Sequence, residues 1–130
     1  MEEEICPCGT GKAYKICCGA IHKGKVKAQT AEELMRSRYS AFTKADGDYL
    51  MRSYHSSTKP LSEKKEIVRW AKSVTWLSLL IVAKTKGTVN DTEGTVEFKA
   101  SFLENGEVKV IYENSYFSKE KGHWVYEREN

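Results

Sequence analysis

The feature that most constrains this chain is a cluster of cysteines near its amino end. Cys6, Cys8, Cys17 and Cys18 fall within thirteen residues, and none occurs elsewhere in the 130 residues. In a reducing compartment, thiols this close in sequence bind metal more often than they form disulfides. Zinc is the expected ion, because it takes tetrahedral four-thiolate sites that are closed to water and substrate. The cluster therefore predicts one structural zinc ion.

Other interpretations of the cluster stay open from the residues alone. The four thiols could be free, or the adjacent Cys17 and Cys18 could act as a redox pair and form a strained disulfide on oxidation. His22 is an alternative ligand, although we expect its side chain to be solvated. The residues do not distinguish zinc from iron in the cell.

The cysteine spacing, C-x-C-x8-C-C, resembles the SEC-C motif, which ends the bacterial secretion ATPase and occurs in many small bacterial proteins. The motif residues here are Cys-Pro-Cys-Gly-Thr-Gly-Lys, then Tyr-Lys and Cys-Cys-Gly, with Thr10 where serine is usual. We expect Gly9, Gly11 and Gly19 to adopt positive φ angles in the turns. The resemblance implies that the four cysteines ligate one zinc and that the motif docks protein partners.

Charge is unevenly distributed along the chain. The formal net charge is +3 and the pI about 8.6, below the range of dedicated nucleic-acid domains. No Asp or Glu lies between Ile5 and Ala31, whereas five lysines do: Lys12, Lys15, Lys23, Lys25 and Lys27. We expect this cationic segment to meet a protein partner, with RNA or ribosome contact through residues 12–27 as an alternative.

The remaining composition gives expectations about location. The chain opens Met-Glu-Glu-Glu, without the positive region and apolar stretch of a secretory signal, so a cytoplasmic location is expected. The longest apolar run, residues 76–83, is far shorter than the roughly 20 residues that cross a bilayer, so no membrane span is expected.

The chain divides into three predicted parts: a zinc knuckle at residues 1–20, a basic linker at 21–29, and a main domain at 30–130. The linker shows no sustained hydrophobic period. Thr30 and Glu33 form a capping box, which starts a helix near Ala31.

Helices are predicted in the first half of the main domain and strands in the second. The first helix carries an apolar stripe that includes Leu34, Phe42 and Ala45, a second is capped by Asp48, and a third begins near Ser62. Four strands follow, at residues 76–82, 96–102, 108–117 and 123–128. This order predicts an α+β fold, in which helices pack on one face of a curved antiparallel sheet.

The main domain resembles the YchJ-like family of uncharacterised bacterial proteins. The resemblance rests on residues 35–42 (Met-Arg-Ser-Arg-Tyr-Ser-Ala-Phe), 48–50 (Asp-Tyr-Leu), His55, Glu113, Ser115, Phe117, Gly122, Trp124 and Tyr126. It implies a cone-shaped domain of the nuclear-transport-factor-2-like, or cystatin-like, type. Such domains often enclose a pocket between helices and sheet.

One residue of the first helix conflicts with burial. Arg38 lies on the apolar stripe, and a buried guanidinium needs acidic or accepting partners. Glu113 and Ser115 are the expected partners, since Val108, Val110 and Tyr112 can pack on the opposite face of their strand. The predicted pocket residues are Arg38, Tyr39, His55, Glu113 and Ser115, for a small anionic or polar ligand. The other interpretation, which we favour from the residues, is a buried ion pair that only fixes packing.

No reaction is indicated by the residues. They contain no arguable set of nucleophile, base and orienting group and no glycine-rich phosphate loop, so binding is favoured over catalysis. The preferred interpretation is a cytoplasmic zinc-binding adaptor with a scaffold or pocket domain. The alternatives are a small-molecule-binding or enzymatic cone-shaped domain with an accessory knuckle, and an RNA- or ribosome-associated factor. The oligomeric state is not indicated.

Overall fold

A computed structural model describes residues 4–130. The elements in chain order are the 3-10 helix η1 (Tyr14–Ile16), α1 (Cys18–His22), α2 (Ala31–Thr43), α3 (Gly47–Arg52), the 3-10 helix η2 (Leu61–Glu63), α4 (Lys64–Ser73), β1 (Thr75–Lys86), β2 (Glu93–Glu104), β3 (Glu107–Glu120) and β4 (His123–Glu129). Within residues 4–130, no helix has the length and apolar character needed to span a membrane.

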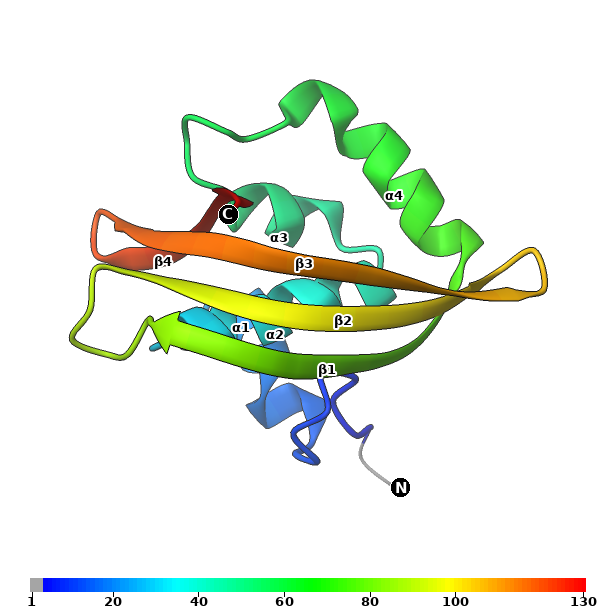
Figure 1. Ribbon diagram of the computed structural model, residues 1–130, viewed down its shortest axis with the longest axis horizontal. Coiled ribbons are helices and arrows are strands. Elements are labelled where there is room, and N and C mark those ends of the chain that lie inside the picture. Colours follow the sequence, from blue (N-terminus) through cyan, green and yellow to red (C-terminus); the bar gives the residue numbers. More distant parts are fainter. Residues whose placement is uncertain (1–3) are drawn as a thin grey trace.

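The four strands form one antiparallel sheet in the order β1-β2-β3-β4. The last two hairpins turn at Asn105-Gly106 and Lys121-Gly122, where all four φ angles lie between 53° and 81°. Two consecutive positive φ angles are typical of the tight turn whose twist matches antiparallel strands. Figure 1 shows the strands in one layer with α2 and α3 behind it. The predicted α+β fold is confirmed.

The sheet turns one face toward the helices. On β2 the alternating residues Val96, Phe98, Ala100 and Phe102 are at most 6% exposed, and the first three share a core with residues of α2. On β3, by contrast, Val108, Val110 and Tyr112 are 53–66% exposed. The expectation that these three side chains pack was wrong. Ser115 and Phe117 are buried on the inner face. Because side chains alternate between the two faces of a strand, these even-numbered residues of β3 lie on the outer, solvent-facing side.

The helix starts agree only in part with their predicted caps. Thr30 Oγ1 accepts a hydrogen bond from the Glu33 amide at 3.1 Å, as predicted, but the Glu33 carboxylate accepts from the Gln29 amide rather than from that of Thr30. The cap of α3 is Asp46, not Asp48. The reason is that α2 ends at Thr43, and Ala45, predicted within its apolar stripe, takes a left-handed φ of 53° that turns the chain early.

Helix α2 buries a cation among aromatic rings. Arg38 is 5% exposed, and its Nη1 donates to Ser53 Oγ at 2.6 Å. Its guanidinium carbon lies 4.5 Å and 4.3 Å from the ring centroids of Tyr54 and Tyr126. Burial was predicted correctly, but the expected partners were wrong: within residues 4–130 no ion pair joins Arg38 to Glu113. Two electron-rich ring faces and one hydroxyl take the place of a carboxylate.

We predict that Arg38→Ala lowers the free energy of unfolding by about 2–4 kcal/mol, because it leaves a void between two tyrosine rings. Arg38→Lys should also destabilise, since an ammonium cannot stack flat on both rings. Chemical denaturation measures both effects, with exposed Arg69→Ala on α4 as the control. A loss below about 0.5 kcal/mol for Arg38→Ala would contradict this account.

Candidate metal centre and cavities

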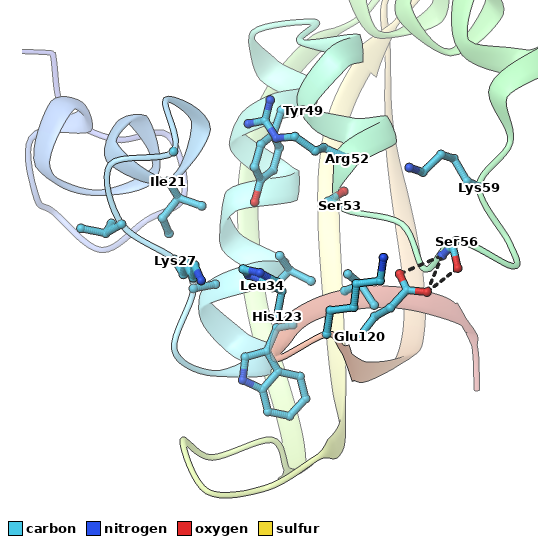
Figure 2. Close-up of a pocket in the computed structure, with 16 residues that line it drawn as sticks. Ile21, Lys27, Leu34, Tyr49, Arg52, Ser53, Ser56, Lys59, Glu120 and His123 are labelled. Atoms are coloured by element: carbon cyan, nitrogen blue, oxygen red, sulfur yellow. Dashed lines mark hydrogen bonds between the residues drawn. The ribbon is translucent and has the colours of Figure 1, made fainter.

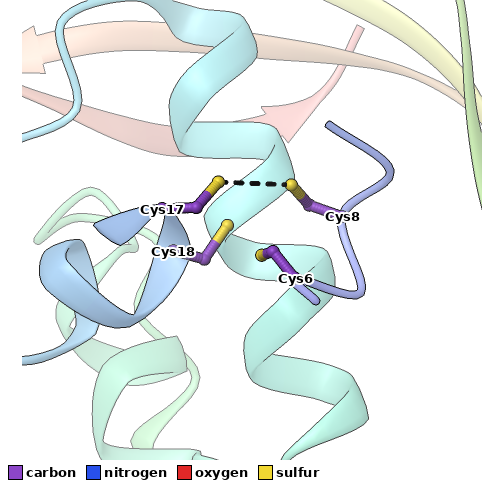
Figure 3. A group of neighbouring side chains, drawn as sticks. All are labelled: Cys6, Cys8, Cys17 and Cys18. Carbon is purple, nitrogen blue, oxygen red and sulfur yellow. Dashed lines mark hydrogen bonds between the residues drawn. The ribbon is translucent and has the colours of Figure 1, made fainter. Parts of the chain in front are cut away.

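The four cysteine sulfurs converge at one point, as Figure 3 shows. All four Sγ atoms lie within 4.8 Å of one another, and those of Cys8 and Cys17 are 3.6 Å apart. Four sulfurs at about 2.3 Å from a central zinc ion would be about 3.8 Å apart. Cys6, Cys8 and Cys18 are at most 3% exposed. The donor set and its spacing therefore fit a closed tetrahedral metal site.

Short backbone contacts bring the two cysteine pairs together. An antiparallel bridge joins Ile5 to Ala13, and two turn glycines, Gly9 and Gly11, have φ angles of 92° and 82°, as predicted. Gly19 was predicted to share this conformation, but it lies in α1 with an ordinary helical backbone. Glycine is needed at position 19 because there is no room for a side chain: a Cβ there would lie 2.6 Å from the carbonyl oxygen of Tyr14.

The electrostatics of the cluster favour a divalent cation. A hydrogen bond with Cys18 lowers the pKa of the Cys8 thiol to about 4, whereas the same bond and burial raise the pKa of Cys18. Burial also raises the pKa of Cys17. A thiolate at Cys8 thus opposes ionisation of Cys17 and Cys18, because negative charges repel one another in a desolvated space. A bound zinc ion would compensate this charge and tie the two arms together.

The cysteine segment packs directly on helix α2. Cys6 Sγ lies 3.5 Å from Ser40 Oγ, and Arg36 Nη1 donates to the Cys8 carbonyl at 2.6 Å. Both residues of α2 are separated from their partners by more than 25 positions in the sequence. The knuckle is therefore attached to the main domain by side-chain contacts as well as by the chain.

His22 is a further attachment of this kind, and the expectation that it is solvated was wrong. It is 8% exposed, and its Nε2 lies 2.8 Å from the Ser37 carbonyl. Because a carbonyl can only accept, Nε2 carries the proton, and Nδ1 accepts from Tyr14 OH at 2.6 Å. Burial lowers the pKa of His22. The group of possible metal ligands in the described chain contains the four cysteines and not His22.

The predicted linker, residues 21–29, begins inside α1, which ends at His22. At its other end the Gln29 carbonyl accepts a hydrogen bond from Trp124 Nε1 at 3.2 Å. The segment is thus held by buried residues at both ends. The domain boundaries at 20 and 30 stay a prediction.

A cavity of about 180 Å³ lies between the helices and the inner face of the sheet. Four of the five predicted pocket residues line it: Arg38, Tyr39, Glu113 and Ser115. His55 does not; it follows α3 in a loop, where its Nδ1 accepts from the Ser57 amide at 3.0 Å and lies 3.7 Å from Glu120. The cavity also has aromatic walls that were not among the predicted pocket residues: Phe42, Tyr54, Trp70, Trp76, Phe98 and Tyr126.

Three polar residues of this cavity, Glu113, Ser115 and Tyr126, share one hydrogen-bond group. Glu113 accepts hydrogen bonds from Tyr126 OH, at 3.0 Å, and from Ser115 Oγ. Burial raises the pKa of Tyr126 and raises that of Tyr39 to about 12, so both hydroxyls stay protonated at neutral pH. The hydroxyls of Ser115 and Tyr126 thus both point to one carboxylate. This hydrogen-bond group fixes the positions of the three side chains at the cavity.

Comparison with known proteins agrees with this two-part organisation. Residues 30–128 match the family of the YchJ middle NTF2-like domain, and residues 4–20 match the SEC-C motif. A UPF0225 protein of Streptomyces coelicolor is 39% identical over 126 residues, covering 97% of this chain and 94% of the relative. The chain belongs to the UPF0225 family. A UPF0225 protein of Geobacter sulfurreducens is also 39% identical, over 94% of this chain and 76% of the relative.

Two solved structures share the fold of this UPF0225 chain. A SEC-C motif containing protein from Rhodopseudomonas palustris, solved in solution, is 29% identical with a TM-score of 0.85, covering 99% of this chain and 98% of that one. A crystal structure of a SEC-C motif containing protein from Psychrobacter arcticus is 32% identical with a TM-score of 0.82, covering 95% of this chain and 80% of that one. The similarity therefore includes the cysteine segment as well as the sheet.

We predict one zinc ion per chain by elemental analysis, with four thiols becoming reactive after chelation. Cys8→Ser should lose the metal and disorder residues 5–20, while the sheet stays folded because the main core contains no residue of the knuckle. Thr10→Ser, which keeps the hydroxyl near Cys8, is the matched control. Retention of zinc by Cys8→Ser, or loss of the strand signals in its NMR spectrum, would contradict the prediction.

We predict that the buried His22 makes the free energy of unfolding depend on pH. Its pKa in the folded chain is lowered from 6.5, so below pH 6.5 the unfolded state binds more protons and stability falls as the pH decreases through the folded pKa. His22→Gln should show a smaller loss between pH 7.5 and 5.5 in chemical denaturation, whereas His123→Gln, at an exposed position, should behave as the wild type. Equal pH dependence in all three proteins would refute a buried neutral His22.

Proposed function

We propose that this protein is a zinc-stabilised adaptor that docks an acidic, partly apolar segment of a partner protein on its amino-terminal motif. The observation that carries the proposal is the outer surface of the cysteine segment, where Ile5 and Ile16 are 60% and 68% exposed. The surrounding residues 5–31 include five lysines and no carboxylate. Exposed apolar side chains next to cations favour a partner with the opposite charge.

The metal in this proposal is structural. The four cysteines supply all the ligands that a tetrahedral zinc needs, and three of them are buried. Partner recognition therefore falls to the residues outside the cluster, which the metal holds in place. We place this activity in the cytoplasm, where thiols stay reduced and available to metal.

RNA or ribosome contact is the less supported use of the same lysines. Stacking on single strands needs accessible aromatic rings, and Tyr14 is the aromatic residue within residues 12–27. Its hydroxyl bonds to His22 and its ring is covered by Lys44 Nζ at 4.5 Å from the centroid. Tyr14 therefore serves packing, and a protein partner accounts better for the exposed isoleucines.

A ligand in the inner cavity is the second candidate function. Arg38 and Glu113 do line one cavity, which the small-molecule alternative requires. However, about 180 Å³ is below the roughly 300–1,000 Å³ of typical ligand pockets, and Arg38 and Glu113 already have hydrogen-bond partners within the protein. The adaptor proposal has the stronger support.

The adaptor surface can be tested with two exposed residues of similar character. Ile16 in η1 and Leu61 in η2 are 68% and 65% exposed, so aspartate at either position has little effect on folding. Immobilised Ile16→Asp should retain at least ten-fold less of the partner protein from an extract of the producing bacterium than the wild type or Leu61→Asp, at equal zinc content. Quantitative mass spectrometry measures the retained proteins.

Two results would contradict the adaptor proposal. Equal retention by Ile16→Asp and Leu61→Asp would show that the cysteine segment is not the docking surface. Retention that disappears after ribonuclease treatment would instead favour the RNA alternative.

A further inference from the structure

A second and larger cleft has a volume of about 580 Å³. It is lined by Leu34 of α2, Tyr49 of α3 and three further segments of the chain, shown in Figure 2. These are residues 21–28 after the cysteines, residues 52–59 at the end of α3 and beyond, and residues 120–125 of the β3–β4 hairpin. None of the predicted pocket residues lines it.

The cleft has an apolar floor. Leu34, Trp124 and Val125 line it and are 4–6% exposed. Ile21 and Ala28 of the amino-terminal segment add partly buried apolar surface. Such a floor accommodates an aliphatic or aromatic group that leaves water.

Its rim is cationic. Four of its lining residues carry a positive charge at neutral pH, namely Lys27, Arg52, Lys59 and Lys121, against one carboxylate, Glu120. In Figure 2 the side chain of Lys59 extends from its loop toward the space between the segments. Because like charges from three segments meet over an apolar floor, the cleft concentrates positive potential and attracts anions.

Some charged groups of the rim have partners within the protein and others do not. Glu120 accepts from the Ser56 amide at 3.1 Å and from Ser56 Oγ, and Arg52 Nη2 donates to the His22 carbonyl at 2.7 Å. In the described chain, residues 4–130, the ammonium groups of Lys27 and Lys59 have neither a hydrogen-bond nor an ion-pair partner. Two cations on opposite sides of the cleft are therefore available to a ligand.

We propose that this cleft binds a small amphiphilic organic anion, with a phosphate or carboxylate between Lys27 and Lys59 and an apolar group on the floor beside Trp124. The volume lies within the range of small-molecule sites. The site differs from the proposed docking surface, because neither Ile5 nor Ile16 lines it. Failure of one proposal therefore leaves the other intact.

Tryptophan positions make this proposal testable with a simple probe. Trp124 lines the cleft, whereas Trp70 and Trp76 line the inner cavity, and the chain has three tryptophans in all. On titration of the zinc-loaded protein with phenyl phosphate, the NMR signal of the Trp124 indole N–H should move while the other two stay. Inorganic phosphate and phenol should each bind at least ten-fold more weakly, because each lacks one half of the recognised chemistry.

Matched double variants separate a specific site from net charge. Lys27→Ala/Lys59→Ala should weaken phenyl phosphate binding at least ten-fold, whereas Lys65→Ala/Lys72→Ala, which removes the same charge from α4, should not. An unmoved Trp124 signal, movement of Trp70 or Trp76 instead, or equal weakening in both double variants would overturn the proposal. Inorganic phosphate binding as tightly as phenyl phosphate would overturn the amphiphilic class of ligand.

Discussion

The structure depends on helix α2 being buried on nearly all sides. Its polar residues Ser37, Arg38 and Ser40 are at most 5% exposed, so each needs an internal partner. Ser37 Oγ donates to the Leu34 carbonyl and accepts from Tyr49 of α3, Arg38 lies between two tyrosine rings, and Ser40 faces the cysteine cluster. Helix α2 thereby orients α3, the sheet and the knuckle, because each of its buried polar side chains must be placed beside a suitable partner.

This arrangement would give a metal bound by the four cysteines a role beyond the knuckle. The cysteine cluster holds the arms that carry Tyr14 and α1, and His22 of α1 bonds to the backbone of α2. Residues 21–28 then continue from α1 to form one wall of the cationic cleft. A structural zinc would therefore stabilise the cleft at a distance, by fixing the start of the segment that lines it.

The two cavities differ in how their charges are balanced. In the inner cavity Arg38, Glu113 and Tyr126 are paired with protein groups, as in a packed core. The polar lining of the inner cavity was largely predictable, because alternation along β3 and the YchJ-like resemblance both bear on Glu113 and Ser115. The outer cleft was not predictable, since its cations come from three segments and no local spacing connects Lys27 with Lys59.

Features that depend on neighbouring residues could be predicted from the sequence: the four-cysteine donor set, the Thr30 cap and the order of helices and strands. These follow from spacing, side-chain chemistry and backbone φ over a few positions. Packing between distant segments, by contrast, selects which face of β3 is buried, which groups surround Arg38, and the burial of His22 against Ser37. Such contacts join residues far apart in the chain, and they are selected by the mutual packing of whole elements, because each buried polar group must find a partner among those that the fold brings near.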